Sequence, residues 1–301
     1  MKILNYGSLN IDYVYNVDTL VEAGTTKSDK GFTTMAGGKG LNQSIAISKA
    51  GLSEIYHAGN IGRNGEFLKL TLLEHNVKID YIKKSNVDTG HAIIQISDDA
   101  EHTIIVHGGS NYNNEKDIIN QVINEFDEND ILLIQNEIND VAYIIEKAFE
   151  KKMRIFLNPA PFDEKVFTYD LHKIDTLILN EQELYLLVKC KNFDESIKLL
   201  KKYDVNIVIT LGEKGGKYFA RDMKEYSYPC YDVDVVDTTA VGDAFVGYFI
   251  AGIGSQKSIK YILDRSSKAG ALTATKIGSA ISIPSSEDVD KFLGEVFNNE
   301  N

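Results

Sequence analysis

The sequence has too few cysteines for a structure held together by disulfides. Only Cys190 and Cys230 occur in 301 residues, which excludes a disulfide framework and a cysteine-based zinc site. The six histidines include no pair at the His-x-x-x-His spacing of helical metal sites. The proportions of hydrophobic residues, 43%, and charged residues, 25%, are ordinary for a globular protein. We therefore expect a hydrophobic core large enough to be stable without disulfides or a structural metal.

The sequence also lacks long apolar runs and an excess of positive charge. No segment reaches about 18 consecutive apolar residues, so no membrane span and no membrane partner are expected. A strand-like run begins at once at the amino terminus, and we expect no signal peptide. The formal net charge of −12 argues against a nucleic-acid partner, which would need a basic patch. A cytoplasmic location is the resulting expectation.

Strands and helices alternate through most of the chain. Apolar runs predict strands at residues 2–6, 55–59, 131–135, 154–157, 176–179 and 206–210. Apolar residues at helical spacing predict helices over residues 41–50, 139–151 and 194–203. A further helix is predicted to end at about residue 75. This alternation is typical of a parallel sheet flanked by helices.

A few short segments with alternating polar and apolar residues do not fit that pattern. Residues 13–17 and 32–34 precede the first helix, and residues 92–97 and 103–107 form a predicted hairpin with its turn at 98–100. We predict that these segments build a separate accessory sheet. The tail, Asn298 to Asn301, is expected to fray.

The rest of the chain is organised around Asp237-Thr238-Thr239-Ala240-Val241-Gly242-Asp243. A β-like run at residues 231–236 precedes it, and apolar residues at helical spacing follow from Phe245. It is therefore a loop leading into a helix N-terminus, where free N–H groups bind anions and Gly242 allows close approach. Asp243 is either a helix-capping residue or a base that takes a proton from an alcohol. In the second case, the N–H groups would stabilise the phosphoryl group under attack.

Two segments near the amino terminus carry further candidate ligand groups. Asn10 and Asp12 follow the first strand, where open α/β sheets bind ligands, and their side chains suit either sugar hydroxyls or a turn. Residues 37–40 contain three glycines, which bring the backbone close to a ligand. They match neither the Walker pattern nor the Gly-x-Gly-x-x-Gly fingerprint of dehydrogenases.

Six motifs occur in an order that resembles the ribokinase-like (PfkB) carbohydrate kinase family. They are residues 7–12, 37–43, 158–161 (Asn-Pro-Ala-Pro), 180–183 (Asn-x-x-Glu), 210–215 (Thr-Leu-Gly-x-x-Gly) and 237–243. The resemblance covers essentially the whole chain. It implies a single α/β domain over residues 1–301, a three-layer α/β/α sandwich with a mostly parallel central sheet. It also implies a small β-sheet lid formed by about 11–18, 30–36 and 91–107, and a homodimer joined through this lid.

The activity implied by the resemblance is transfer of the γ-phosphoryl group of ATP to a primary hydroxyl of a small sugar. Mg²⁺ and a monovalent cation, K⁺, are the implied ions. D-ribose is the leading acceptor. The alternatives are fructose, another ketose, a nucleoside such as a pseudouridine-like compound, or a sugar-binding regulator that has lost catalysis.

The resemblance also assigns roles to individual positions. The sugar-binding positions are Asn10, Asp12, Gly38, Lys39, Asn42, Glu137 and Asp243. Asp243 is the general base, and the backbone anion hole comprises Ala240, Val241 and Gly242. The nucleotide contacts are Asn180, Thr210, Leu211, Gly212, Glu213, Lys214, Gly215, Gly242 and Ser267. Glu183, with Asn180, matches the magnesium position, and the monovalent-cation positions are Asp237, Thr239, Thr273, Lys276, Gly278 and Ser282.

Some positions depart from the family pattern or have an open role. Ala240 and Val241 stand where the family usually has Gly and then Ala, although their N–H groups remain. Ser267 stands where a larger polar residue often lies near the adenine, which predicts looser base selectivity. Gln95, His107 and Asn111 either tune the choice of substrate or pack within the lid. Lys39 serves either the chemistry or the geometry of the glycine loop.

Overall fold

The computed structural model describes residues 1–292, with the exception of residues 53 and 100. The predicted fraying tail and the turn residue Ala100 therefore lie outside the described residues. Within the described chain, a nine-stranded main sheet and a four-stranded small sheet form. No helix in the described ranges is both long and apolar enough to cross a membrane.

The main sheet is parallel from β5 through β11 and ends in an antiparallel pair at one edge. In spatial order its strands are β13 (Glu225–Tyr228), β12 (Gly216–Phe219), β11 (Asn206–Thr210), β10 (Thr176–Asn180), β9 (Arg154–Asn158), β8 (Ile131–Gln135), β1 (Ile3–Tyr6), β4 (Ile55–Ile61) and β5 (Lys78–Lys84). Successive residues of a strand point to opposite faces, so Ile3 and Leu4 of β1 belong to different cores. The strands are consequently apolar on both faces, as a sheet covered on both sides requires.

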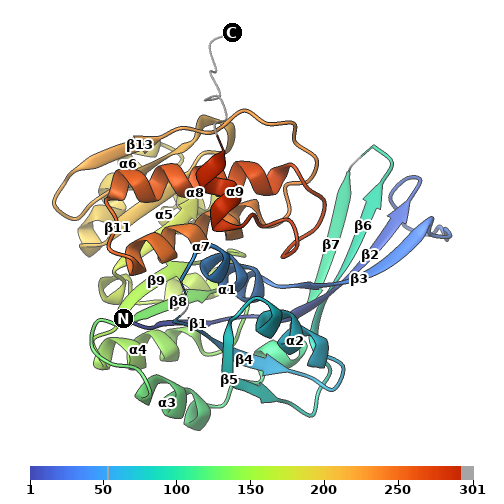
Figure 1. The fold of residues 1–301 in the computed structure, drawn as a ribbon, viewed down its shortest axis with the longest axis horizontal. Coiled ribbons are helices and arrows are strands. Elements are labelled where there is room, and N and C mark those ends of the chain that lie inside the picture. The colour runs from blue at the N-terminus through green and yellow to red at the C-terminus, as the bar shows by residue number, and fades with distance from the viewer. Residues whose placement is uncertain (53, 100, 293–301) are drawn as a thin grey trace.

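Helices cover both faces of this sheet, which confirms the three-layer sandwich (Figure 1). One core lies under α1 (Lys39–Lys49), α2 (Glu66–Glu74), α7 (Val241–Gly254), α8 (Ile259–Ala274) and α9 (Ser286–Lys291). The other core lies under α3 (Lys116–Asn124), α4 (Val141–Glu150), α5 (Glu181–Val188) and α6 (Phe193–Leu200). Short 3₁₀ turns occur at Gly109–Tyr112, Glu164–Thr168, Leu171–Lys173, Lys201–Tyr203 and Gly212–Lys214.

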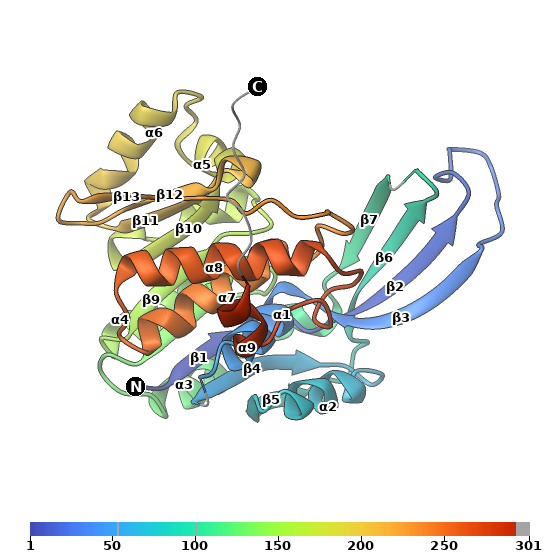
Figure 2. The ribbon, with the colours of Figure 1, turned by 45° about the horizontal axis from the view of Figure 1, so that its top comes forward.

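The small sheet projects from one end of the main body (Figures 1 and 2). Its spatial order is β3 (Gly31–Gly37), β2 (Asn10–Val17), β6 (Gly90–Ser97) and β7 (His102–His107). Strands β2 and β6 pair in parallel, and the two outer pairings are antiparallel. Because β2 begins only a few residues after β1 ends, the small sheet starts at the carboxyl ends of the main-sheet strands. The predicted accessory strands form this sheet.

The predicted β-like run at residues 231–236 is wrong as a strand. Apart from a single bridge at Tyr231, these residues form no regular structure, and Val235 and Val236 are 64% and 54% exposed. The amides of Val236 and Asp237 donate instead to the carbonyl of Ala274, at 2.8 and 3.1 Å, just where α8 ends. The alternation of Val and Asp imitates a strand, but the segment pairs with a helix terminus rather than with a sheet edge.

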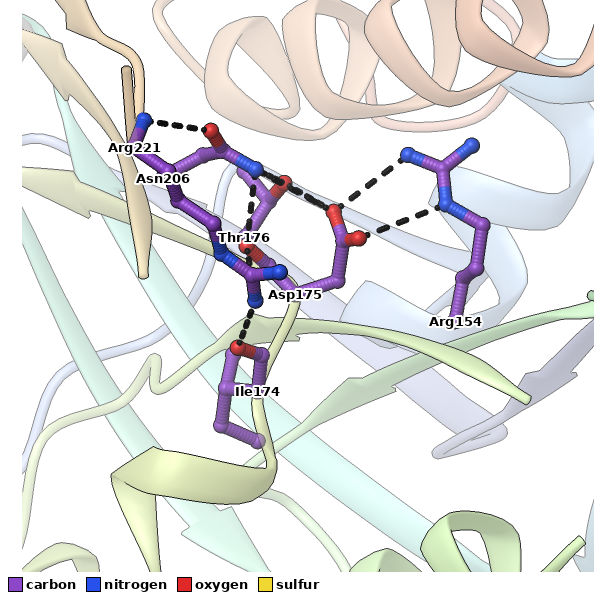
Figure 3. Close-up of polar contacts among 6 residues, drawn as sticks. All are labelled: Arg154, Ile174, Asp175, Thr176, Asn206 and Arg221. Atoms are coloured by element: carbon purple, nitrogen blue, oxygen red, sulfur yellow. Dashed lines mark hydrogen bonds and ion pairs between the residues drawn. The ribbon is translucent and has the colours of Figure 1, made fainter. Parts of the chain in front are cut away.

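A polar cluster ties the amino ends of β9, β10 and β11 together (Figure 3). Arg154 donates to the two carboxylate oxygens of Asp175 at 3.3 and 3.4 Å. Asn206 donates to the carbonyl of Asp175 at 3.0 Å, and Arg221 donates to that of Ile174 at 2.9 Å. These contacts secure the end of the sheet opposite to the one where open α/β sheets bind ligands.

Candidate active site

A cavity of about 490 Å³ lies between the carboxyl ends of the main-sheet strands and the small sheet. The polar side chains and glycines predicted to bind a sugar all line it: Asn10, Asp12, Gly38, Lys39, Asn42 and Glu137. Ala240, Gly242 and Asp243, at the start of α7, line the same cavity. The fold thus brings the predicted sugar positions and the predicted base together around one space.

The first turn of α7 is open toward this cavity. Ala240 precedes the helix with a left-handed φ of 60° and makes no side-chain capping bond. A Cβ built on Gly242 would meet no heavy atom within 4 Å. The positive end of the helix and its first N–H groups therefore face the cavity, an arrangement that suits an anion.

Helix α1 supplies two amide donors to the carboxylate of Asp243. Asn42 Nδ2 donates to Oδ2 at 3.0 Å, and Gln43 Nε2 donates to Oδ1 at 2.9 Å. Asp243 is only 7% exposed. The two bonds hold the carboxylate in one orientation, and each oxygen keeps acceptor capacity for a further partner.

Four carboxyl groups, those of Asp12, Glu137, Glu183 and Asp243, line this cavity together with the ammonium group of Lys39. Burial, and after it the charges of Glu137 and Asp243, raise the pKa of Asp12 to about 7. The charge of Asp243 raises the pKa of Lys39 more than its burial lowers it, and Glu137 and Glu183 act in the same direction. Lys39 is therefore a firmly protonated cation that offsets part of this negative charge.

Glu137 is held in place by the glycine loop and by the segment that follows β1. The backbone N–H of Lys39 donates to Glu137 Oε2 at 2.9 Å, and the hydroxyl of Ser8 donates to the same oxygen. Ser8 lies within a motif of the chain but was missed as a site residue. A serine in a β-turn sequence gives no signal of the distant carboxylate it contacts.

Asn180 and Glu183 form a capping box at the start of α5. Asn180 Oδ1 accepts from the N–H of Glu183 at 2.8 Å, and Glu183 Oε2 accepts from the N–H of Asn180 at 2.9 Å. Both residues line the cavity, and burial raises the pKa of Glu183. The residues described contain no group of three or more His, Cys, Asp or Glu side chains that could hold a metal. The carboxylate of Glu183, with the amide oxygen of Asn180 beside it, fits Mg²⁺, which binds through one or two carboxylates and keeps several waters.

A second cavity, of about 440 Å³, adjoins the first at Thr210, Thr238 and Gly242. Several of the predicted nucleotide positions line it: Thr210, Gly212, Glu213, Gly215, Gly242 and Ser267. Lys214 belongs to neither lining, and Leu211 packs against the core instead. Sequence reasoning missed the apolar walls, among them Tyr228, Val235, Phe245 and Ala271, because apolar residues at such spacings usually indicate core.

Two of the predicted monovalent-cation positions, Thr239 and Gly278, contact the side chain of a third, Asp237. Its carboxylate accepts from the N–H of Thr239 at 2.8 Å and from that of Gly278 at 2.9 Å. Burial raises the pKa of Asp237, but these hydrogen bonds outweigh it and lower the pKa overall. The hydroxyls of Thr273 and Ser282 donate to backbone carbonyls at 2.8 and 2.7 Å. Lys276 follows the end of α8, where its N–H donates to the carbonyl of Thr273 at 3.2 Å.

The three residues with an open role in the small-sheet region have different surroundings. Gln95 accepts from the N–H of Val21 at 3.2 Å, and the ring of His107 lies 5.0 Å from that of His91. Asn111, in contrast, donates to Asn10 Oδ1 at 2.7 Å, which ties it to a predicted sugar position.

Three side chains of β7 reach the first cavity, although they were not singled out from the sequence. They are His102, Ile104 and Val106, which share one face of the strand because side chains alternate along it.

Comparisons with known proteins agree with this geometry. The family described as pfkB family carbohydrate kinase matches residues 1–286. A ribokinase of Staphylococcus aureus (strain COL) is 32% identical, over 96% of this chain and 99% of its own length. The crystal structure of a ribokinase from Thermotoga maritima has a TM-score of 0.87 at 26% identity, and covers 97% of this chain and 99% of its own. Arabidopsis thaliana ribokinase, solved with ribose and ATP, has a TM-score of 0.82 at 26% identity, and covers 96% of this chain and 97% of its own.

Proposed function

The chain belongs to the pfkB family of carbohydrate kinases, and we propose that it phosphorylates D-ribose to D-ribose 5-phosphate with ATP. The observation that carries this proposal is the shared cavity. Residues from β2, the glycine loop, the segment after β8 and the start of α7 surround one space, which adjoins a second space of similar size. A sugar in the first and a nucleotide in the second would meet at Gly242.

The sugar is recognised through its hydroxyl groups. A ribose carries no charge, so its binding needs several oriented donors and acceptors, and Asn10, Asp12, Asn42 and Glu137 provide them. Ile104 and Ala92 of the small sheet add apolar surface on the other side of the cavity. In this proposal the small sheet is a lid over the sugar, and its apolar side chains exclude water from the reaction.

Asp243 is the general base of the proposed reaction. It takes the proton of the primary hydroxyl while the sugar oxygen forms a bond to the γ-phosphorus of ATP, and the bond to the leaving ADP oxygen breaks. The first N–H groups of α7 stabilise the negative charge on the transferred phosphoryl group. The protein contributes mainly alignment and charge neutralisation, which phosphoryl transfer requires.

The second cavity suits the nucleotide, and Glu183 suits its magnesium ion. Tyr228, Val235, Phe245 and Ala271 give this cavity apolar walls for a base. Glu183, with Asn180 beside it, would hold Mg²⁺ through water, and the ion would neutralise phosphate charge. Asp237 and the backbone near Gly278 are the proposed site of a potassium ion, which would reinforce the anion hole.

The small sheet also suits a homodimer contact. Phe32, Ile93 and Ile105 are 51%, 37% and 65% exposed, and exposed apolar side chains gathered on one element are typical of an interaction surface. Ile93 and Ile105 stand opposite each other on β6 and β7. We propose that two copies of this chain cover these surfaces mutually.

The proposed function is tested by measuring ADP formation with ATP, Mg²⁺ and a panel of acceptors. The panel contains D-ribose, 2-deoxyribose, fructose, other pentoses and hexoses, and nucleosides. We expect the highest kcat/KM with D-ribose and a product phosphorylated at the primary hydroxyl. A higher value with fructose or a nucleoside would reassign the acceptor, and sugar binding without turnover would indicate a regulator.

A further inference from the structure

A continuous set of buried amide side chains extends from Asp243 into the main sheet. Gln43 Nε2 donates to Asp243 Oδ1 at 2.9 Å and to Asn158 Oδ1 at 3.0 Å, and Gln43 Oε1 accepts from Gln135 Nε2 at 2.7 Å. Gln43 and Gln135 are 0% and 1% exposed. Gln135 and Asn158 are register partners at the ends of β8 and β9. Gln43 is therefore too buried to touch a bound sugar, and it reaches the cavity through Asp243 and Asn158, which line it.

One end of this set fixes the orientation of the Gln43 amide. Asn158 Nδ2 donates to the backbone carbonyl of Ile178 at 3.0 Å. A carbonyl can only accept a hydrogen bond, so Asn158 must present its oxygen to Gln43. Gln43 must then turn its NH₂ group toward Asn158, and the same NH₂ group reaches Asp243.

The other end imposes the same orientation independently. Asn5 Nδ2 donates to the carbonyl of Gly40 at 2.7 Å, so its Oδ1 accepts from Gln135 Nε2 at 2.9 Å. Gln135 consequently presents its NH₂ group to Gln43, and Gln43 must accept this hydrogen bond through Oε1. This arrangement leaves Gln135 Oε1 without a hydrogen-bond partner among the described residues. In return, Gln135 Nε2 donates to both Asn5 Oδ1 and Gln43 Oε1.

We propose that Gln43 is a positioning residue that holds Asp243 as an oriented hydrogen-bond acceptor, with its own orientation dictated by Asn158 and Gln135. The proposal rests on the kinase function above, because Asp243 is the base there. A reversed Gln43 amide would point its oxygen at the carboxylate and would break buried hydrogen bonds at both ends. The two backbone carbonyls thus decide, through the four amide side chains of the network, that Asp243 meets a hydrogen-bond donor.

The substitution Gln43→Met tests the proposal, because it keeps the volume of the side chain and removes the donor. We expect kcat to fall about 10- to 100-fold, since small misplacements of a reacting group cost this much, while the KM for the sugar changes less than about threefold. The matched control is Ser48→Ala, which removes a half-buried hydroxyl bonded to the carbonyl of His75 from the same helix, outside the amide network. We expect it to keep kcat within about twofold of wild type.

A double-mutant cycle separates positioning from packing. Gln135→Met alone should lower kcat severalfold, but it should add less than about twofold in the Gln43→Met background, because Gln135 acts through Gln43. Additive losses would overturn the proposed transmission. Thermal unfolding of each variant shows whether it is folded, and a network that only stabilised the core would lower the unfolding midpoint without changing kcat.

Crystal structures of the wild type and Gln43→Met provide a readout that does not need activity. We expect the carboxylate of Asp243 to rotate away from its wild-type position, or to occupy two positions, in the variant. An unmoved carboxylate, or an unchanged kcat, would overturn the proposal. If the wild type turns over no acceptor, the proposed function fails, and the position of Asp243 in the variant still decides the positioning role.

Discussion

At the scale of single residues, Asp243 is the group whose removal should cost the reaction most. Asp243→Asn keeps the shape of the side chain and removes its basicity, so kcat should fall by about three orders of magnitude, within the range of general-base catalysis. Sugar binding measured by calorimetry should change only a few-fold, because Asn10, Asp12 and Glu137 remain. Turnover close to wild type would mean that another group removes the proton.

The carboxyl group of Asp12 should give the reaction an acidic limit near neutral pH. Burial, and then the charges of Glu137 and Asp243, raise its pKa to about 7, and only the ionised form offers both carboxylate oxygens as acceptors to the sugar hydroxyls. We therefore expect kcat/KM for the sugar to fall as the pH drops below about 7, through a rise in KM. Asp12→Asn should have a low kcat/KM that does not fall further as the pH drops below about 7. A flat wild-type profile from pH 8 to 5 would contradict the assignment.

The same carboxyl group should make stability depend on pH in the direction opposite to most acids. Its pKa in the folded state lies above the value of about 3.9 in an unfolded chain, so the folded state holds the proton between about pH 4 and pH 7. The stability linked to this proton is present below that window and is lost as the pH rises through it. Asp12→Asn should therefore unfold a few degrees above wild type at pH 8, and the difference should shrink toward pH 5.

Ala240 shows how a departure from the family pattern can carry a structural cost. Its φ of 60° is left-handed, a conformation that glycine adopts without strain and alanine does not. Ala240→Gly should stabilise the protein by roughly 1 kcal/mol, measured by chemical denaturation, because the relief of this strain exceeds the entropy that glycine loses on folding. A destabilised variant would mean that the Ala240 methyl group makes a compensating contact.

At the scale of elements, the close approach of α1 and α7 sets the distance between the base and its amide donors. Gly247 lies one turn after Asp243, and a Cβ placed on it would lie 2.2 Å from the Cβ of Ala46 in α1. Gly247→Ala should push the helices apart and cost about 1–3 kcal/mol of stability, as overpacking does. It should also lower kcat, because Asn42 and Gln43 would no longer reach Asp243 at hydrogen-bond distance.

A substitution at the opposite end of the sheet is the control for this prediction. Asp175→Ala removes the acceptor of Arg154 in the cluster of Figure 3 and should cost about 1–2 kcal/mol. Its kinetic constants should stay near wild type, because the amino ends of the strands are far from the cavities. If both variants lost stability and activity in the same proportion, helix spacing would not be a separate determinant of kcat.

The elements differ in how far their sequences predict them. Strands β8 to β11 are readable from apolar runs because both of their faces are buried. The two antiparallel strands at one side of the sheet, β12 and β13, are short and mix polar and aromatic residues, so no apolar pattern marks them. Residues 231–236 show the converse error, in which an alternating pattern has no neighbouring strand to pair with.

The candidate site was predictable where the chain itself carries motifs. Asn10, Lys39 and Asp243 lie in short, ordered stretches that resemble a family. The amide network behind Asp243 is different, since Gln43 is 200 residues from Asp243 and 92 from Gln135. Hydrogen bonds between buried side chains that are so far apart in the sequence depend on the packed fold, and no local sequence pattern predicts them.

At the scale of the whole molecule, the small sheet carries apolar side chains on both faces. Ile104 and Val106 line the cavity, whereas Ile105 is 65% exposed and, by strand alternation, points the other way. The four-stranded sheet projects from the body (Figure 2), and within residues 1–292, apart from 53 and 100, no second layer covers that outer face. A second copy of the chain would supply that layer, and it would also hold the lid in a fixed position over the sugar.

Ile105→Lys tests this arrangement, because it adds a charge to the outer face and leaves the cavity lining intact. We expect the wild type to be a dimer by light scattering at micromolar concentration and the variant to be a monomer, since an unpaired buried charge costs several kcal/mol at an interface. The KM for the sugar should rise as the lid loses its support. Met223→Lys, on the turn between β12 and β13, replaces another exposed apolar side chain, 69% exposed, and should change neither property. A monomeric wild type, or a dimeric Ile105→Lys variant, would show that the outer face of the lid is not where two copies meet.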